Sequence, residues 1–213
     1  MNKKVIILLS DGLDSPVASY QMMKKGFMPV FVTFITTNQY ATQMEKKVLT
    51  IVHQLIKDFT LPAKLYFIPH NNNLTQIIST CPRKLTCILC KRLMYRIALA
   101  LGSREGTNII ITGDILGEQA SQTLSNLRAY SDLFKGSIKL SPLIGLNKLD
   151  IIHRNKDIGV YDIASQKLQS CLNYPQYPET HAKLKEVEDA EKKLDLKRII
   201  SKSLETSKKI EIQ

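Results

Sequence analysis

The stretch with the clearest chemical potential is Ser10–Ser15 (SDGLDS), which follows the apolar run Val5–Leu9 and precedes Pro16 and a helical pattern. A buried strand that leads through a short glycine turn into a helix directs backbone N–H groups and the positive helix end toward one point. Such a point suits a phosphate group, and Asp14 or Ser15 can cap the helix. The same residues also fit an ordinary strand-to-helix turn that binds nothing.

The second set of reactive side chains consists of the cysteines Cys81, Cys87, Cys90 and Cys171. They are too few for a disulfide scaffold of this size, so thiol chemistry or metal binding is the better interpretation. Cys87 and Cys90 form a Cys-x-x-Cys pair, which fits metal binding, dithiol chemistry or plain packing. A lone Cys171 is more often a small buried hydrophobe. The histidines show no ligand spacing with the cysteines, which argues against zinc.

The elements that must position these residues alternate between strand and helix. Strands are predicted at Val5–Leu9, Pro29–Phe34, Lys64–Ile68, Asn108–Thr112 and Ile138–Leu143, and helices at Pro16–Lys25, Thr42–Phe59, Cys90–Leu101 and Gln119–Leu133. This alternation predicts an α/β, Rossmann-like fold: a parallel sheet of about five strands with helices on both faces. Ligands of such sheets bind at the carboxyl ends of the strands.

The chain of 213 residues is long enough for one substantial core. Residues 1–178 are expected to form the main domain. Residues 179–213 have Leu184, Val187, Ala190, Leu194 and Ile199 at near-helical spacing, which predicts two amphipathic helices packed on the same domain.

Charge is the strongest compositional signal. The formal net charge is +11 and the isoelectric point is near 9.5, with almost all of the excess before Glu179. The charge favours a polyanionic partner, although a lysine-rich surface can also serve solubility alone. The apolar run after Lys4 is too short for a membrane span and no cleavage signal follows it, so a cytoplasmic protein without a membrane partner is expected.

Four ordered stretches carry a family resemblance. Ser10–Ser15 resembles the Ser-Gly-Gly-x-Asp-Ser loop of the PP-loop ATP pyrophosphatases, and PVASYQMMKKG after it is similar to the tRNA 4-thiouridine synthetases (tRNA sulfurtransferases, thiamine-biosynthesis type). CKRLMYRIA, TGDILGEQASQTLSNL and PLIGLNKLDII resemble the same family in the same order, as does the segment around Cys171. The resemblance covers the catalytic domain only; the family's RNA-binding modules and rhodanese-like extension are not expected in this sequence.

The resemblance implies a two-step reaction, in which ATP adenylates a uridine carbonyl oxygen in tRNA and a sulfur nucleophile then displaces AMP. Asp14 would help to position Mg²⁺, Lys148 would stabilise charge at the transferred phosphate, and Cys171 would handle the sulfur. Without the family, Lys148 is an ordinary solvated lysine at a helix start. The ATP site implied by family position comprises Leu8, Leu9, Ser10, Gly12, Asp14, Ser15, Thr33, Phe34, Lys91, Gly113 and Gln122.

The resemblance also implies partners and a further cofactor. The partners are tRNA, a sulfur donor that is a persulfide carrier or sulfide, and a separate RNA-binding protein or the basic face itself; a homodimer would suit a basic domain without its RNA modules. Cys87, Cys90 and Cys171 could ligate three irons of an iron–sulfur cluster, as in related cluster-dependent thiolases.

Two residues depart from the family pattern. Asp11 replaces a glycine, and a carboxylate about 4 Å from a phosphate costs on the order of 4 kcal/mol at an effective dielectric constant of 20. We therefore expect the Asp11 side chain to point to solvent and activity to persist. Ile115 replaces a small polar residue, which puts the floor of the pocket in question.

Three function classes remain open from the sequence: the tRNA sulfurtransferase, an adenylating enzyme with a small-molecule or carrier-protein acceptor, and a non-catalytic subunit that binds ATP or RNA. Pyrophosphate release that depends on tRNA and on Lys148 distinguishes the first from the other two.

Overall fold

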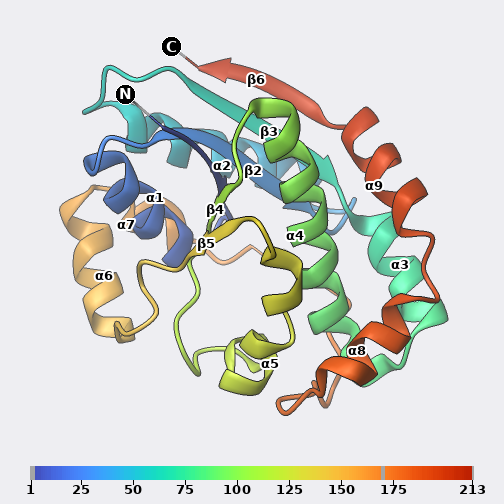
Figure 1. Cartoon of the computed structure of the whole chain (residues 1–213). Helices are drawn as coiled ribbons and strands as arrows, with labels where there is room; N and C mark the ends of the chain where they lie inside the picture. Colours follow the sequence, from blue (N-terminus) through green and yellow to red (C-terminus); the bar gives the residue numbers. More distant parts are fainter. Residues whose placement is uncertain (1–2, 169–170, 213) are drawn as a thin grey trace.

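The protein, described by a computed structural model over residues 3–168 and 171–212, is built around a mixed sheet (Figure 1). Within those residues the sheet has six strands in the order β5-β4-β1-β2-β3-β6. The strands are β1 (Lys4–Leu8), β2 (Met28–Ile35), β3 (Ala63–Pro69), β4 (Ile109–Ile111), β5 (Ile138–Leu140) and β6 (Lys208–Ile212). The first five are parallel, and β6 pairs antiparallel with β3.

Helices cover both faces of the sheet. The helices are α1 (Asp14–Lys24), α2 (Ala41–Ile56), α3 (Asn71–Thr80), α4 (Thr86–Glu105), α5 (Leu124–Arg128), α6 (Lys148–Asp157), α7 (Tyr161–Ala164), α8 (Leu184–Glu191) and α9 (Leu196–Glu205). Val5 and Ile7 of β1 pack in one core cluster with α1, α2, α6 and α7, whereas Ile6 packs with α3, α4, α8 and α9. Alternate side chains of a strand point to opposite faces, so β1 is buried on both sides. The predicted doubly covered α/β fold is confirmed.

Several parts of the chain differ from the predicted elements, among them α3, α6 and α7, which the sequence analysis did not predict. The predicted helix over Gln119–Leu133 is wrong: Thr123 is extended, with φ −70° and ψ 158°, and separates a 3₁₀ turn at Ala120–Gln122 from α5. The break lets Asn126 donate to the carbonyl of Glu179 at 2.7 Å. The expected C-terminal helices are present as α8 and α9, but the chain continues into β6, which the sequence analysis did not predict.

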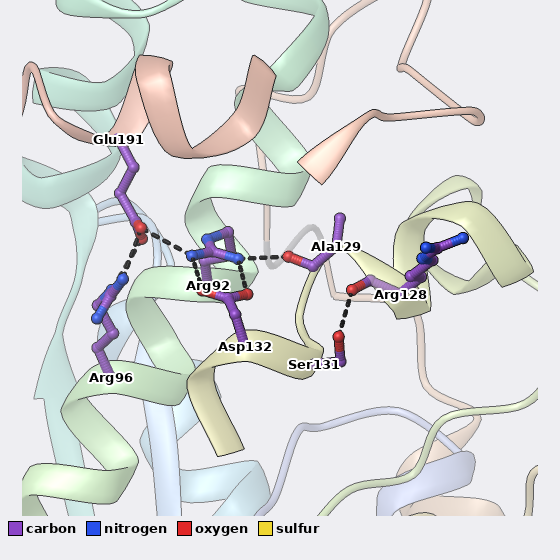
Figure 2. Close-up of polar contacts among 7 residues, drawn as sticks. All are labelled: Arg92, Arg96, Arg128, Ala129, Ser131, Asp132 and Glu191. Carbon is purple, nitrogen blue, oxygen red and sulfur yellow. Dashed lines mark hydrogen bonds and ion pairs between the residues drawn. The ribbon is translucent and has the colours of Figure 1, made fainter. Parts of the chain in front are cut away.

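A buried arginine joins three parts of the α4 side (Figure 2). Arg92 of α4 is fully buried and forms a bidentate ion pair with Asp132, at 2.7 and 2.8 Å, and another with Glu191 of α8 at 2.9 Å. It also donates to the carbonyl of Ala129. Arg96, whose side chain is partly exposed, also donates two hydrogen bonds to Glu191, at 2.7 and 2.9 Å. This network holds α8 and the segment around Ser131–Phe134 against α4.

In the described ranges, none of the helices combines the length and apolar character that crossing a membrane requires.

Candidate active site at the carboxyl edge of the sheet

The loop Ser10–Ser15 follows β1 and is closed by its own serines. The Ser10 backbone N–H donates to Ser15 Oγ at 2.8 Å, and the two hydroxyl oxygens lie 3.0 Å apart. The helix α1 begins at Asp14, and its N-cap Leu13 provides no side-chain cap. The expectation that Asp14 or Ser15 caps this helix is therefore wrong, because the Ser15 hydroxyl binds Ser10 instead. First-turn N–H groups that no side chain caps can bind an anion.

Gly113 presses against the start of α1. A Cβ at this position would lie 2.8 Å from the Ser15 nitrogen and 2.9 Å from its Cα, closer than any side-chain carbon tolerates. Only glycine lets the loop after β4 reach the helix start, so Gly113 fixes the position of the first turn of α1. The structure thus brings together Gly113 and Ser15, two of the residues that the resemblance assigns to the ATP site.

Lys148 lies beside Asp14. As the first residue of α6, it follows Asn147, whose side chain forms a capping box with Asp150. Lys148 Nζ lies 2.9 Å from Asp14 Oδ1 and 3.4 Å from Glu118 Oε1. Burial lowers the pKa of Lys148, but hydrogen bonding and attraction to Asp14 and Glu118 outweigh it and leave the pKa raised. The ammonium is therefore charged at neutral pH and is held at the N-terminus of α1.

A second lysine cluster surrounds the buried carboxylate of Asp114. Lys91 Nζ lies 2.6 Å from Oδ1 and Lys139 Nζ lies 2.7 Å from Oδ2, and Thr112 donates to Oδ2 at 2.9 Å. Burial raises the pKa of Asp114, but the two lysines overcome this and hold it far below its usual range. Sequence reasoning named Lys91 but missed Asp114 and Lys139. The signal available was an aspartate in the loop that follows a buried strand, where ligand sites of parallel sheets lie.

The remaining proposed ATP-site residues lie at the carboxyl ends of β1 and β2, apart from Gln122 in the 3₁₀ turn Ala120–Gln122. Thr33 is fully buried and donates to the Leu9 carbonyl at 2.8 Å. The Phe34 ring stacks edge-on with His70, with 5.2 Å between centroids. Leu8 is half-buried at the end of β1. Gln122 is buried, and its Oε1 has no hydrogen-bond partner among the described atoms.

Two further observations concern the loop and its neighbours. Gly12 lies in open surroundings, where an added Cβ would approach Ser10 Oγ at 3.6 Å. Ile115 is buried in the core cluster that contains α1, so its side chain contributes packing.

Asp11 does not point to solvent, and that expectation is wrong. Its side chain is 8% exposed, and Oδ2 lies 3.4 Å from Nζ of Lys47 on α2. The same ammonium donates to the carbonyls of Ala164 at 3.2 Å and Gln166 at 2.7 Å. The reason is a buried cation 36 positions away in sequence, which draws the carboxylate toward α2 and the end of α7.

The cysteines gather on the other side of the sheet. Cys87 and Cys90 lie in the first two turns of α4, and both interact electrostatically with Cys171. Burial, followed by the neighbouring thiols, raises the pKa of Cys87 and of Cys90. Cys90 Sγ lies 3.3 Å from Nε2 of the fully buried His70, a contact that sequence spacing did not reveal.

These thiols do not form a ready metal site. In residues 3–168 and 171–212, no three histidine, cysteine, aspartate or glutamate side chains are placed to hold a metal ion. The iron–sulfur cluster suggested for Cys87, Cys90 and Cys171 stays a prediction. Cys81 is buried against the Ala190 carbonyl at 3.3 Å. Gln169 and Ser170, which belong to the segment that resembles the family around Cys171, lie outside the described residues.

Comparison with known proteins places these observations in a family. The sequence model described as "Thiamine biosynthesis protein (ThiI)" matches residues 1–196. A probable tRNA sulfurtransferase of Methanosarcina mazei is 38% identical over 216 residues, covering 98% of this chain and 52% of the relative. One of Methanocaldococcus jannaschii is 34% identical over 197 residues, covering 91% and 50%. The chain therefore spans about half the length of the curated relatives it matches.

Solved structures agree in fold. The crystal structure of a 4-thiouridine synthetase–RNA complex with bound ATP superposes with a TM-score of 0.91 at 28% identity, covering 99% of this chain and 55% of that one. The NMN synthetase of Francisella tularensis superposes with a TM-score of 0.58 at 18% identity, covering 88% and 76%, which is a likeness of fold alone.

Proposed function

The chain belongs to the thiamine biosynthesis protein (ThiI) family, and we propose that it catalyses ATP-dependent adenylation of a uridine carbonyl in tRNA, followed by sulfur transfer to form 4-thiouridine. The observation that carries the proposal is the Lys148–Asp14 pair at the uncapped N-terminus of α1, with 2.9 Å between Nζ and Oδ1. A cation, a carboxylate and helix N–H groups without a side-chain cap suit a triphosphate and its magnesium ion.

The PP-loop, Ser10–Ser15, would bind the pyrophosphate part of ATP through backbone N–H groups. Asp14 fits Mg²⁺ because this ion is commonly bound by one or two carboxylates together with substrate phosphates. Mg²⁺ would supply neutralisation of phosphate charge. On binding, Lys148 would turn from Asp14 to the α-phosphate, where a fixed positive charge stabilises the transition state.

The other residues of the proposed site would hold the nucleoside and the charge around it. Gln122 Oε1 lacks a partner in the described part of the chain and could accept a hydrogen bond from a base amino group. Lys91 is held by Asp114 at 2.6 Å, which keeps a charged ammonium near the loop after β4. The floor below the nucleotide would be formed by residues at the ends of β1 and β2: Leu8, Leu9, Thr33 and Phe34.

The chemistry balances in two steps. The uridine carbonyl oxygen attacks the α-phosphorus of ATP and pyrophosphate leaves. Sulfide would form the carbon–sulfur bond directly as AMP leaves with the oxygen. A persulfide would form the same bond through its terminal sulfur, and a neighbouring thiol would then attack the carrier sulfur, which releases the thiocarbonyl and leaves a disulfide between the two thiols. Cys171 is the proposed sulfur-handling residue, and its influence on the pKa of Cys87 and of Cys90 supports a role for neighbouring thiols in that step.

The test is pyrophosphate release from ATP and Mg²⁺ with unmodified tRNA, compared with no RNA and with a small-molecule acceptor set. Lys148→Ala should reduce the rate by a hundredfold or more, as removal of one transition-state donor does elsewhere. Lys156→Ala is the matched control because Lys156 lies at the other end of α6, over the ring of Tyr161 at 5.2 Å. Release without tRNA dependence would favour another acceptor. ATP binding without any release would favour a non-catalytic subunit.

A further inference from the structure

A cavity of about 330 Å³ lies between α3 and α9, away from the PP-loop. Figure 1 shows the two helices side by side beyond the end of β3. One wall carries the amide side chains of Asn71, Asn72 and Gln76 on α3, and the other carries Arg198 and Lys202 on α9. Its volume lies at the lower end of small-molecule binding sites.

The back of the pocket is fixed. Asn73 of α3 donates to Ser203 Oγ of α9 at 2.9 Å, and both side chains are buried. Pro69 and the buried Ile199 supply an apolar surface beside this bond. Because the bond joins the two helices directly, the walls keep a defined separation before any ligand binds.

The pocket is electropositive at its mouth. Arg198 and Lys202 are exposed and lie one turn apart on α9. Across residues 3–168 and 171–212, neither side chain forms an ion pair. Asp195 also lines the pocket, but its carboxylate caps α9 by accepting from the Arg198 backbone N–H at 3.1 Å. The first turn of α3 contains no acidic residue and has no side-chain cap at His70, so the positive end of this helix also favours an anion.

The pocket and the PP-loop share one edge of the sheet. Ser10 follows β1, Asn38 follows β2 and Pro69 ends β3, and these three strands are parallel. A polyanion bound in the pocket can therefore continue along the carboxyl edge toward the loop. Amides that can read a base edge, beside two cations that can hold a phosphate, match one nucleotide of an RNA strand.

We propose that the α3–α9 pocket binds one nucleotide of the RNA substrate, with its phosphate at Arg198 and Lys202 and its base edge at the amides of Asn71 and Asn72. This inference rests on the proposed function, because it assigns a binding surface to the same RNA. The pocket lies apart from the PP-loop, and its test measures tRNA binding, whereas the test of the proposed function measures pyrophosphate release.

The test uses fluorescence anisotropy with labelled, unmodified tRNA over a series of salt concentrations. Arg198→Gln combined with Lys202→Gln should raise Kd about tenfold at 0.1 M salt and lower the slope of log Kd against log salt by about 1.4, the value for two contacts to a single strand. Asn71→Ala combined with Asn72→Ala should raise Kd severalfold at an unchanged slope. Lys185→Gln combined with Lys193→Gln, two exposed lysines outside the pocket, is the control of equal charge and should change Kd less than twofold.

Equal losses in the control pair, or an unchanged tRNA affinity in the pocket pair, would overturn the proposal. Binding of ATP and of inorganic phosphate is measured with the same variants. If these ligands lose affinity and tRNA does not, the pocket is a site for free anions and the proposal is overturned. Pyrophosphate release by the wild-type chain separates the two ideas. If pyrophosphate is released but the pocket variants bind tRNA normally, the proposed function holds and the pocket proposal fails. If the pocket variants lose tRNA affinity but the wild type releases no pyrophosphate, the pocket proposal holds and the proposed function fails.

Discussion

Lys47 Nζ lies 3.4 Å from Asp11 Oδ2, and both side chains are only 8% exposed. The carboxylate that replaces the family's loop glycine is thus paired with a buried cation, and the pair connects the loop to α2. The pairing explains how a loop that is proposed to bind pyrophosphate can contain a negatively charged side chain.

The Lys47–Asp11 pair predicts how each substitution changes the affinity for ATP. Lys47→Met leaves Asp11 unpaired beside the phosphate site, so Kd for ATP should rise about ten- to a hundredfold, equivalent to roughly 1.4–2.8 kcal/mol. Asp11→Gly should change Kd by less than threefold. The double variant should recover most of the lost affinity, as measured by isothermal titration calorimetry. If the double variant binds ATP as weakly as Lys47→Met, the loss comes from the contacts of Lys47 with Ala164 and Gln166 and the electrostatic account is wrong.

Gly113→Ala is predicted to displace the start of α1. The added Cβ would lie 2.8 Å from the Ser15 nitrogen, so backbone must shift at the PP-loop. We expect a loss of about 1–3 kcal/mol in the free energy of unfolding, as in other overpacked sites, together with a large loss of pyrophosphate release. Urea unfolding and the release assay measure the two effects. Gly145→Ala is the control, since an added Cβ there meets nothing within 4 Å; equal behaviour of both variants would argue against a positioning role for Gly113.

Arg92→Leu is predicted to be strongly destabilising. It strips the buried partner from Asp132 and Glu191, and breaking a buried ion pair from one side costs about 3–5 kcal/mol. Arg96→Leu removes a cation from the same Glu191 but at a side chain that is 30% exposed, so about 1 kcal/mol is expected. Urea unfolding of both variants tests the contrast, and equal small losses would show that burial of the Arg92 network matters little.

Acid should weaken the same network. Burial raises the pKa of Glu191, but hydrogen bonds from Arg96 and Arg92 outweigh it and leave the pKa lowered. A carboxyl group with a lowered folded pKa contributes stability above its unfolded value, here 4.5, and loses it as pH falls through the folded value. Each unit of difference is worth about 1.4 kcal/mol.

Glu191→Gln should therefore start less stable than the wild type at pH 7 and lose less stability on acidification. Urea midpoints taken between about pH 5.5 and 3.5 should converge for the two proteins. Parallel curves would show that Glu191 keeps its ordinary pKa in the folded chain.

The parts of the fold that follow from local pattern could be predicted from the sequence. Runs of apolar residues identify β1 and β2, because strands covered on both faces are predominantly apolar. The helix α3 escaped prediction because it opens with three asparagines, whose own propensity for helix is poor. β6 escaped because Lys208–Ile212 has little apolar content and owes its conformation to pairing with β3.

The site shows the same division. The family resemblance assigns Asp14 and Lys148 to the site with separate roles, and the structure has them in contact. Nothing local marks Lys47 as the partner of Asp11, or His70 as the neighbour of Cys90, because both contacts depend on how α2 and α4 lie against the loops. Long-range side-chain pairs require the tertiary structure.

The antiparallel strand β6 has a consequence for the order in which the protein is made. Its partner β3 is synthesised early, but this edge of the sheet stays open until α8 and α9 have been added. Pairings between distant segments form late, because the entropy cost of closing the intervening loop comes before the contacts that offset it. The α3–α9 pocket is thus expected to assemble on a nascent chain only after the PP-loop has already folded.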